Sequence, residues 1–184
     1  MSRRILLGVF VLLVLHAFAL YAMGQHWIFE GGYVKLWHGV VISDENSQHL
    51  TDWYTLSHII HGILFYAGLS YVFPRLSVGT RLLMALAIES GWELFENTDM
   101  IINRYREQAL AQGYFGDSIV NSTGDMLAAL IGFLVAWRIP VWGSVIAIVV
   151  LEGIALYFIR DSLTLNIVQL IHPVEWIGEW QSTR

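Results

Sequence analysis

The stretch SHIIHGILFYAGLSYVF, from Ser57 to Phe73, joins an apolar segment to two histidines placed three residues apart. A helix that crosses a bilayer needs about 20 mainly apolar residues, and this segment with its flanks is of that length. Hydrophobic residues make up 56% of the chain and charged residues 14%, a balance typical of integral membrane proteins. The stretch therefore predicts a membrane-spanning helix that carries His58 and His61 near one end.

Five such segments follow one another in what we expect to be a single membrane domain over residues 1–184. The expected spans lie near residues 5–23, 54–73, 82–97, 118–137 and 141–159. The first is longer than the apolar core of a signal peptide, so we expect it to be retained. The tail, with Trp176 and Trp180 beyond Pro173, is expected to lie on the membrane interface. The predicted class is all-α: an integral membrane helical bundle of about five transmembrane helices with an interfacial C-terminal segment.

The arginines predict how this bundle is oriented. Residues 1–4, 75–81 and 138–140 connect the spans on one side and contain arginines but no acid. Cytoplasmic segments of membrane proteins are enriched in Lys and Arg, so we expect these segments and the N-terminus in the cytoplasm. Five spans then place the C-terminus on the outer side.

Composition also excludes several kinds of chemistry and partner. The chain has no cysteine, which excludes disulfides, thiolate metal sites and thiol nucleophiles. A formal net charge of −5 with no basic run argues against a nucleic acid partner. Any chemistry must therefore use imidazole and oxygen ligands.

Ionisable residues occur at a similar depth in several of the expected spans. Glu89, Glu93 and Glu96 follow i, i+4, i+7 spacing and share one face of a helix. A charged side chain within a span costs a few kcal/mol, so such residues normally face a protein interior and serve a purpose. We therefore predict one shared polar site in the outer half of the bundle. Its remaining candidates are His58, His61, Asp117, Asn121, Ser122, Asp125 and Glu152.

Small residues on the same spans would let the helix backbones approach closely around this site. They are Gly62, Gly91, Gly124, Ala128 and Gly132.

The histidine pair favours a metal site. Two imidazoles at i, i+3 can reach one ion, and Glu93 and Asp125 are the expected further ligands. A His and carboxylate set suits a divalent metal such as Zn, Fe or Mn. Glu89 or Glu96 is then the expected catalytic base.

The same residues have a purely structural interpretation. The histidines could be hydrogen-bonding groups between helices, and the glutamates could pair with them or with Arg104 and Arg106. These arginines could also bind the phosphate or carboxylate of a headgroup above the site, or lie in an ordinary exposed loop. Three further histidines are isolated in the sequence and are expected to be structural: His16, His38 and His49.

The motifs DWYTLSHIIHG, ESGWELFENTDMIINRYR and YFGDSIVNSTGDMLAALIGF, with GGYVKLWHGVV upstream, resemble the bacterial membrane family UPF0314, also called DUF2585. The resemblance covers nearly the whole chain. It implies a multi-pass protein of the bacterial inner membrane, and it implies no particular reaction.

Three classes of function remain open. The first is a metal-dependent intramembrane enzyme that acts on a lipid or lipid-linked substrate, with membrane lipid as its partner. The second is a proton- or ion-coupled transport component, in which the buried acids relay charge. The third is a non-catalytic scaffold or accessory subunit, whose polar layer fixes helix register. The residues leave open whether the protein is an enzyme.

Overall fold

The computed structural model describes residues 2–108, 110–111 and 113–183. Within these residues the chain folds into eight α-helices and contains no strand, which confirms the predicted all-helical class. The helices are α1 (Arg3–Ala22), α2 (Thr55–Val72), α3 (Val78–Glu96), α4 (Asp99–Arg106), α5 (Ile119–Arg138), α6 (Val141–Ile159), α7 (Leu163–Ile171) and α8 (Glu175–Ser182).

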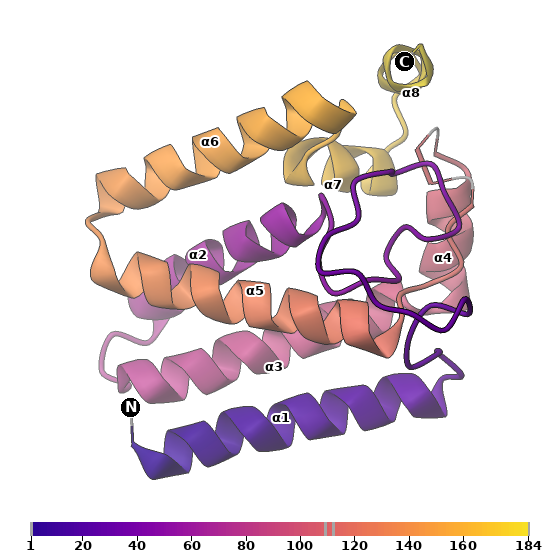
Figure 1. Ribbon diagram of the computed structural model, residues 1–184. Coiled ribbons are helices and arrows are strands. Elements are labelled where there is room, and N and C mark those ends of the chain that lie inside the picture. Colours follow the sequence, from indigo (N-terminus) through magenta and orange to yellow (C-terminus); the bar gives the residue numbers. More distant parts are fainter. Residues whose placement is uncertain (1, 109, 112, 184) are drawn as a thin grey trace.

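Five long helices run side by side and form the bundle (Figure 1). Four of them, α1, α2, α5 and α6, are long and apolar enough to cross a membrane. The fifth, α3, has a similar length of 19 residues, but three glutamates and Arg81 make it more polar. It begins at Val78, four residues before the expected start at 82, because the Ser77 hydroxyl caps the helix by accepting the Thr80 N–H at 3.1 Å. Helix α3 packs against α1, α2 and α5.

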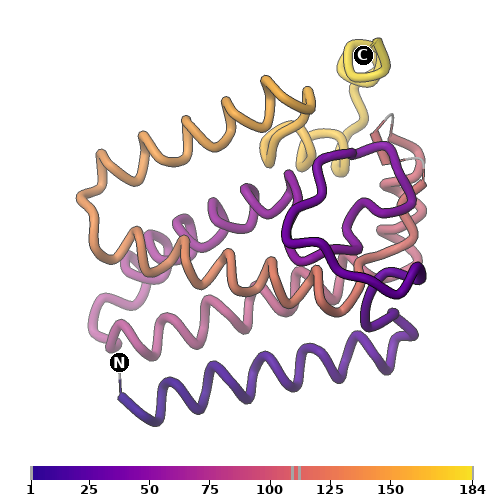
Figure 2. Tube along the Cα trace, in the orientation of Figure 1, coloured from indigo at the N-terminus to yellow at the C-terminus, as the bar shows by residue number. Residues whose placement is uncertain are grey.

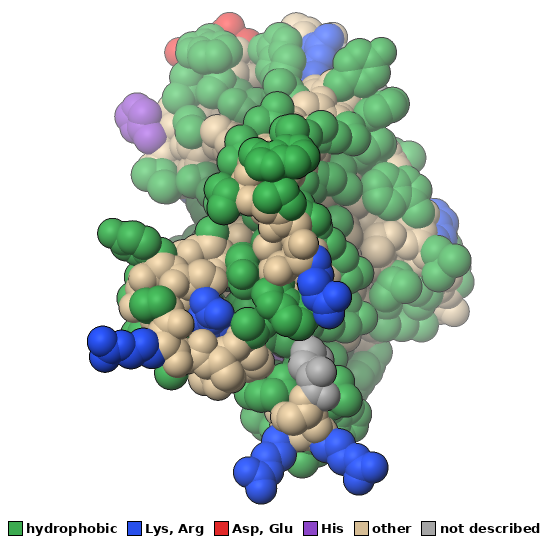
Figure 3. Space-filling model, turned by 90° about the vertical axis from the view of Figure 1, so that its left-hand side faces the viewer, with side chains coloured by type: hydrophobic (Ala, Val, Ile, Leu, Met, Phe, Trp, Pro, Cys, Tyr) green, Lys and Arg blue, Asp and Glu red, His purple; other side chains and the backbone are tan. Residues whose placement is uncertain are grey.

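The two ends of the bundle differ in character. At one end lie the N-terminus and the short connections α2–α3 and α5–α6 (Figure 1). Figure 3 looks onto this end and shows basic side chains set in a largely apolar surface. Residues 2–4, 75–81 and 138–140, which carry arginines without acids, therefore gather at one end.

The opposite end is covered by irregular chain and short helices. Residues 24–53 contain no helix or strand, and their trace coils over this end beside α4 and α7 (Figure 2). The tail forms the two short helices α7 and α8, and Ile171 and Trp176 are exposed there while Ile177 is buried.

Close contact between α2 and α5, the most extensive helix pair, rests on glycines. A Cβ on Gly62 would lie 2.0 Å from the Ala129 carbonyl oxygen, and a Cβ on Gly132 would lie 2.0 Å from that of Ile59. Each helix therefore supplies a glycine at the point where the carbonyl of the other helix approaches. Gly124 makes the same kind of contact with the Leu50 carbonyl oxygen, at 2.1 Å. Gly91, expected from the sequence to act in the same way, faces open space instead.

Replacing Gly132 by alanine should destabilise the protein by about 1 to 3 kcal/mol, because the added methyl group forces the two backbones apart. The matched control is Gly91→Ala on α3, where a Cβ meets nothing within 4 Å. Thermal unfolding in detergent should show a lower midpoint for Gly132→Ala and an unchanged or higher one for Gly91→Ala. Equal midpoints for the two variants would contradict the role given to this contact.

Candidate metal centre

His58 and His61 lie on the buried side of the first turns of α2, with exposed fractions of 7% and 9%. The start of this helix is fixed by Asp52, whose Oδ1 accepts the N–H groups of Tyr54 at 2.8 Å and Thr55 at 3.3 Å. A carboxylate that accepts free N–H groups at the beginning of a helix stabilises that end. The cap thus sets the depth at which both imidazoles enter the bundle.

Glu89 of α3 contacts both histidines. His58 Nδ1 lies 2.6 Å from Glu89 Oε1, and His61 Nδ1 lies 3.1 Å from Glu89 Oε2. An ionised carboxylate can only accept hydrogen bonds, so each imidazole donates through Nδ1. In the neutral ring this leaves the Nε2 lone pair free, which is the arrangement found in histidines that bind metals.

Glu93, one turn further along α3, is bonded on one side only. Its Oε2 accepts a short hydrogen bond from the Ser122 hydroxyl of α5. Its Oε1 is buried and has no hydrogen-bond partner within the described chain. The nearest donor, His58 Nδ1, is 3.1 Å away, but it is bonded to Glu89. A buried, unpaired carboxylate oxygen therefore faces His58.

Asp125 of α5 repeats this pattern. Its Oδ1 accepts a hydrogen bond from the Thr55 hydroxyl at 2.9 Å, and its Oδ2 lies 3.9 Å from His58 Nε2. That separation is too long for a hydrogen bond. Two ligand atoms that each lie 2.0–2.2 Å from one ion can be up to about 4 Å apart, so the separation fits a shared cation.

Two groups of potential ligand atoms thus meet on His58. One group is His58, Glu93 and Asp125, and the other is His58, His61 and Glu89; within each, the ligand atoms all lie within 4.8 Å of one another. All five residues are buried. The residue types and spacings fit a divalent ion bound by imidazole and carboxylate.

His16 also belongs to this network, although the sequence showed it as isolated. Its Nε2 lies 2.8 Å from the hydroxyl of Ser122, and its Nδ1 lies 3.0 Å from that of Ser90. Since Ser122 donates its proton to Glu93, its oxygen accepts from His16, and His16 thereby helps to position the Glu93 carboxylate through Ser122. The available signal was a histidine in the middle of the most apolar part of α1, where a polar group is costly unless it is bonded.

A cavity of about 70 Å³ opens beside the histidines, and Glu93 is not among its lining residues. That volume can hold a few water molecules. His58, His61 and Asp125 reach its wall, together with Glu96 and Asp117. Among the described residues that line it, none is Lys or Arg.

Tyrosines bond to the carboxylates at the outer part of this cavity. The Tyr105 hydroxyl donates to Glu96 Oε1 at 2.5 Å, and the Tyr114 hydroxyl donates to Asp117 Oδ1 at 2.9 Å. Asn97 Nδ2 also donates to Asp117, at 2.6 Å. Burial raises the pKa of Asp117 from 3.8 to about 6, although the hydrogen bonds from Asn97 and Tyr114 act to lower it. No sequence pattern connects these tyrosines with the site, because they lie in the segment between α3 and α5.

Asn121 lies next to the site in a supporting position. Its side-chain amide donates to the His49 carbonyl oxygen at 2.7 Å and lies 3.4 Å from Asp52 Oδ2. It therefore joins the start of α5 to the residues that cap α2.

Three expected members of the site lie elsewhere. Glu152 is near the start of α7, with its oxygens 3.4 Å from the Thr164 N–H, because α6 turns this side chain toward α7. Arg104 donates to the Leu170 carbonyl oxygen at 3.2 Å and pairs with Glu107 at 2.9 Å. Arg106 donates to the Tyr114 carbonyl oxygen at 2.5 Å. These arginines join segments of the chain and are not among the described residues that line the cavity.

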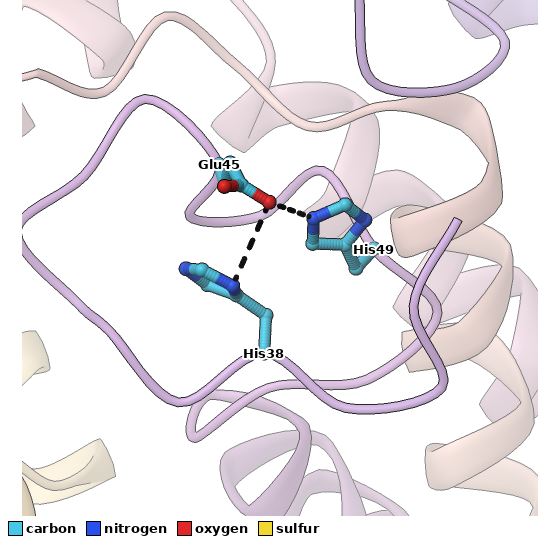
Figure 4. A group of neighbouring side chains, drawn as sticks. All are labelled: His38, Glu45 and His49. Atoms are coloured by element: carbon cyan, nitrogen blue, oxygen red, sulfur yellow. Dashed lines mark hydrogen bonds and ion pairs between the residues drawn. The ribbon is translucent and has the colours of Figure 1, made fainter. Parts of the chain in front are cut away.

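A second His and Glu group lies in the 24–53 loop and contains His38 and His49, which are isolated in the sequence and expected to be structural. Glu45 lies between the two rings (Figure 4), with Oε2 2.7 Å from His49 Nε2 and 4.0 Å from His38 Nδ1. The Lys35 ammonium also donates to this Glu45 oxygen. His49 Nδ1 accepts the Lys35 N–H at 3.2 Å, so its Nε2 carries the proton and donates to Glu45. The Lys35 ammonium and the His49 N–H therefore already bond to the Glu45 oxygen that a metal ion would need.

Comparison with known proteins places the chain in a family. The model of the family described as "Protein of unknown function (DUF2585)" matches residues 20–183. The chain belongs to this family, UPF0314. A UPF0314 protein of Paracoccus denitrificans is 48% identical over 173 residues, which are 94% of this chain and 90% of that protein. A UPF0314 protein of Sinorhizobium fredii is 55% identical over 161 residues, or 87% of this chain and 81% of the relative. No solved structure matches the chain.

A buried aspartate at the cavity end of this UPF0314 protein predicts a dependence of stability on pH. Asp161 follows α6 and is buried, with Oδ1 accepting the Ser162 N–H at 2.9 Å and Oδ2 accepting from the Tyr54 hydroxyl at 3.3 Å. Burial raises the pKa of Asp161 from 3.8 to about 6. The folded state therefore binds this proton more tightly than the unfolded state, so the group's contribution to stability is complete below pH 4 and is lost as the pH rises through 6.

Asp161→Asn should remove the loss of stability that accompanies ionisation of this aspartate, since asparagine does not ionise. The difference in unfolding midpoint between pH 4 and pH 7 should be smaller in the variant than in the parent chain. Asp44→Asn, which changes an exposed aspartate, is the control and should keep the parent's pH dependence. The same pH dependence in Asp161→Asn and the parent would refute this assignment.

Proposed function

We propose that this chain is a metal-dependent enzyme of the bacterial inner membrane, in which His58, Glu93 and Asp125 hold a divalent ion such as Zn, Fe or Mn. We further propose that it acts on a lipid or lipid-linked substrate. The observation that carries the proposal is the buried Oε1 of Glu93, which has no hydrogen-bond partner in the described chain.

An unpaired carboxylate oxygen in a protein interior is costly, and its cost is removed by a cation or a donor. Glu93 and Asp125 each use one oxygen to accept from a hydroxyl. The other oxygen lies near the His58 ring, 3.1 Å from Nδ1 for Glu93 and 3.9 Å from Nε2 for Asp125. Ligating carboxylates are typically held by hydrogen bonds of this kind. An ion bound by His58 Nε2 would neutralise both carboxylates, whereas the Nδ1 proton of His58 is already bonded to Glu89 and Nε2 lies 3.9 Å from Asp125, too far for a hydrogen bond.

Glu89 takes a supporting role in this proposal. It accepts from Nδ1 of both histidines and thereby orients the rings and fixes the tautomer that can ligate. His61 shares this support and reaches the cavity wall, so it can join the ion or contact the substrate. The assignment makes Glu89 a positioning residue.

Glu96 is the proposed general base. It reaches the cavity wall and is held by the Tyr105 hydroxyl at 2.5 Å, outside both groups of ligand atoms. A bound divalent ion activates water as a nucleophile and polarises an ester or phosphate oxygen of the substrate. Glu96 would accept the proton of the attacking water and return it to the leaving oxygen.

The proposed orientation rests on the two ends of the bundle. The arginine-bearing residues 2–4, 75–81 and 138–140 gather at one end and favour a cytoplasmic location for it. The cavity lies at the other end, under the 24–53 loop and α7. In this orientation the site faces the headgroups of the outer leaflet, which is where a lipid substrate would be reached.

The metal assignment predicts a stoichiometry of about one divalent ion per chain in detergent-purified protein, measured by elemental analysis. Added Zn or Mn at 100 times its Kd should stabilise the parent chain by about 2.7 kcal/mol, since the ion binds only the folded state. Glu93→Gln and Asp125→Asn should lose both the ion and this stabilisation. Glu152→Gln, which removes a carboxylate outside the group, should keep them.

Well-folded parent protein that holds no metal and whose unfolding is unchanged by Zn, Fe or Mn would refute the metal site. Loss of the ion in all of the variants, including Glu152→Gln, would point to a general effect on folding and would count against the ligand assignment.

The catalytic assignment predicts that Glu96→Gln keeps the ion and loses the activity. The measurement compares the membrane lipids of one bacterial host that expresses the parent chain, Glu96→Gln or His58→Ala, by mass spectrometry. The parent should change a lipid species that both variants leave unchanged, while elemental analysis should find the ion in Glu96→Gln and not in His58→Ala. Lipid profiles that are the same with and without the parent chain would contradict the enzymatic part of the proposal.

A further inference from the structure

The loop between α1 and α2 carries an exposed segment without acidic residues. Residues 33–43, YVKLWHGVVIS, form what we call the apolar tip. Leu36 is 79% exposed and Ile42 is 63% exposed, and Trp37 and Val40 are exposed beside them. A contiguous apolar surface of this kind usually marks a contact with a membrane or a partner.

Several carbonyl groups of the apolar tip accept hydrogen bonds within the protein. The Leu36 oxygen accepts from the Thr51 hydroxyl, and the Gly39 oxygen accepts from Trp53 Nε1 at 3.1 Å. The Val40 oxygen accepts from His38 Nε2 at 2.9 Å. Backbone groups that enter a low-water environment must be satisfied internally, whereas a loop in water needs no such partners.

The charge at the base of the apolar tip is also neutralised. Lys35 is paired with Glu45, and His49 donates to the same carboxylate at 2.7 Å (Figure 4). These two contacts lower the pKa of Glu45 to about 2, so it remains ionised at any ordinary pH. The tip can therefore enter the membrane interface without an unpaired cation. We call Lys35, Glu45 and His49 the clasp, because their contacts join the two sides of the loop at the base of the tip.

The apolar tip is continuous with the surface of α6. Trp37 contacts Trp53 edge to face at 5.0 Å between ring centroids, and Trp53 stacks on Phe158 at 5.1 Å. Phe158 lies in the last turn of α6, a helix long and apolar enough to cross a membrane. Because α6 ends beside the tip, the tip lies at the depth where this helix would leave the membrane. Trp side chains are enriched at that depth.

We infer that the apolar tip inserts into the lipid headgroup and acyl boundary of the leaflet at the cavity end of the bundle. Lipid is favoured over a partner protein or a second copy because the tip continues the surface of α6 and several of its carbonyl groups are bonded internally. Asn46 and Ser47, which follow the tip in the same loop, line the cavity. Insertion would hold that part of the cavity wall at headgroup level, whether or not the site binds a metal.

The absence of cysteine in the chain allows a direct test with single spin labels. Leu36→Cys and Ile42→Cys place a nitroxide on the tip, and Asp44→Cys places one on the exposed side of the same loop. The full chain is reconstituted in phosphatidylcholine and phosphatidylglycerol vesicles. Accessibility to oxygen, which partitions into lipid, is compared with accessibility to a water-soluble nickel chelate, and each variant is first shown to unfold at the parent's midpoint.

The ratio of oxygen to nickel accessibility should be several-fold higher at positions 36 and 42 than at 44. Equal ratios at the three positions would show that the tip lies in water and would overturn the inference. Protection of positions 36 and 42 from both reagents would also overturn it, because it would mean that protein covers the tip. Two label positions keep the test valid if one variant fails to fold.

Discussion

The contact on which the rest of the structure depends is the close approach of α2 and α5. Gly62 and Gly132 let each helix bring a carbonyl oxygen to within 2.0 Å of the position that a Cβ would occupy on the other. This approach carries Thr55 and His58 on α2 to Asp125 on α5. Without it, the polar groups of the two helices would face lipid or one another at longer range, where burial is costly.

Helix α3 completes the site because its glutamates are bonded to both partners of that pair. Glu89 contacts the histidines of α2, and Glu93 accepts from Ser122 of α5. Since α3 is too polar to be counted among the four apolar helices, these contacts also explain how it is accommodated in the bundle. The polar layer is therefore part of the packing of the helices as well as a candidate site.

The sequence predicted the long helices well because apolar length and helical periodicity are local properties. The same periodicity placed Glu89 and Glu93 on one face of α3, and counting from helix ends put them at the depth of His58 and Asp125. It could not give the side-chain partners of each group. His16 joins Ser122 across a separation of 106 residues, and the direction of Glu152 depends on how α6 packs.

The irregular segments were the least predictable part of the chain. The contacts of residues 24–53 include side chains bonding to distant carbonyl groups, as in the Trp53 contact with Gly39 or the Asn121 contact with His49, and backbone bonds such as that from the Ser118 N–H to the Ser47 oxygen. Such contacts have no period in the sequence. His49 at i+4 from Glu45 was the one local signal for the clasp, and the contribution of Lys35 to it could be seen only in the fold.

The central claim is that the unpaired oxygen of Glu93 faces a metal ion that His58 also binds. X-ray absorption spectroscopy of the zinc-loaded, detergent-purified chain tests this most directly, because imidazole ligands give a characteristic outer-shell scattering pattern. The account predicts nitrogen and oxygen ligands at about 2.0–2.2 Å, with imidazole scattering that is lost in His58→Ala. Zinc whose spectrum lacks imidazole scattering, or is the same in the parent chain and His58→Ala, would contradict it.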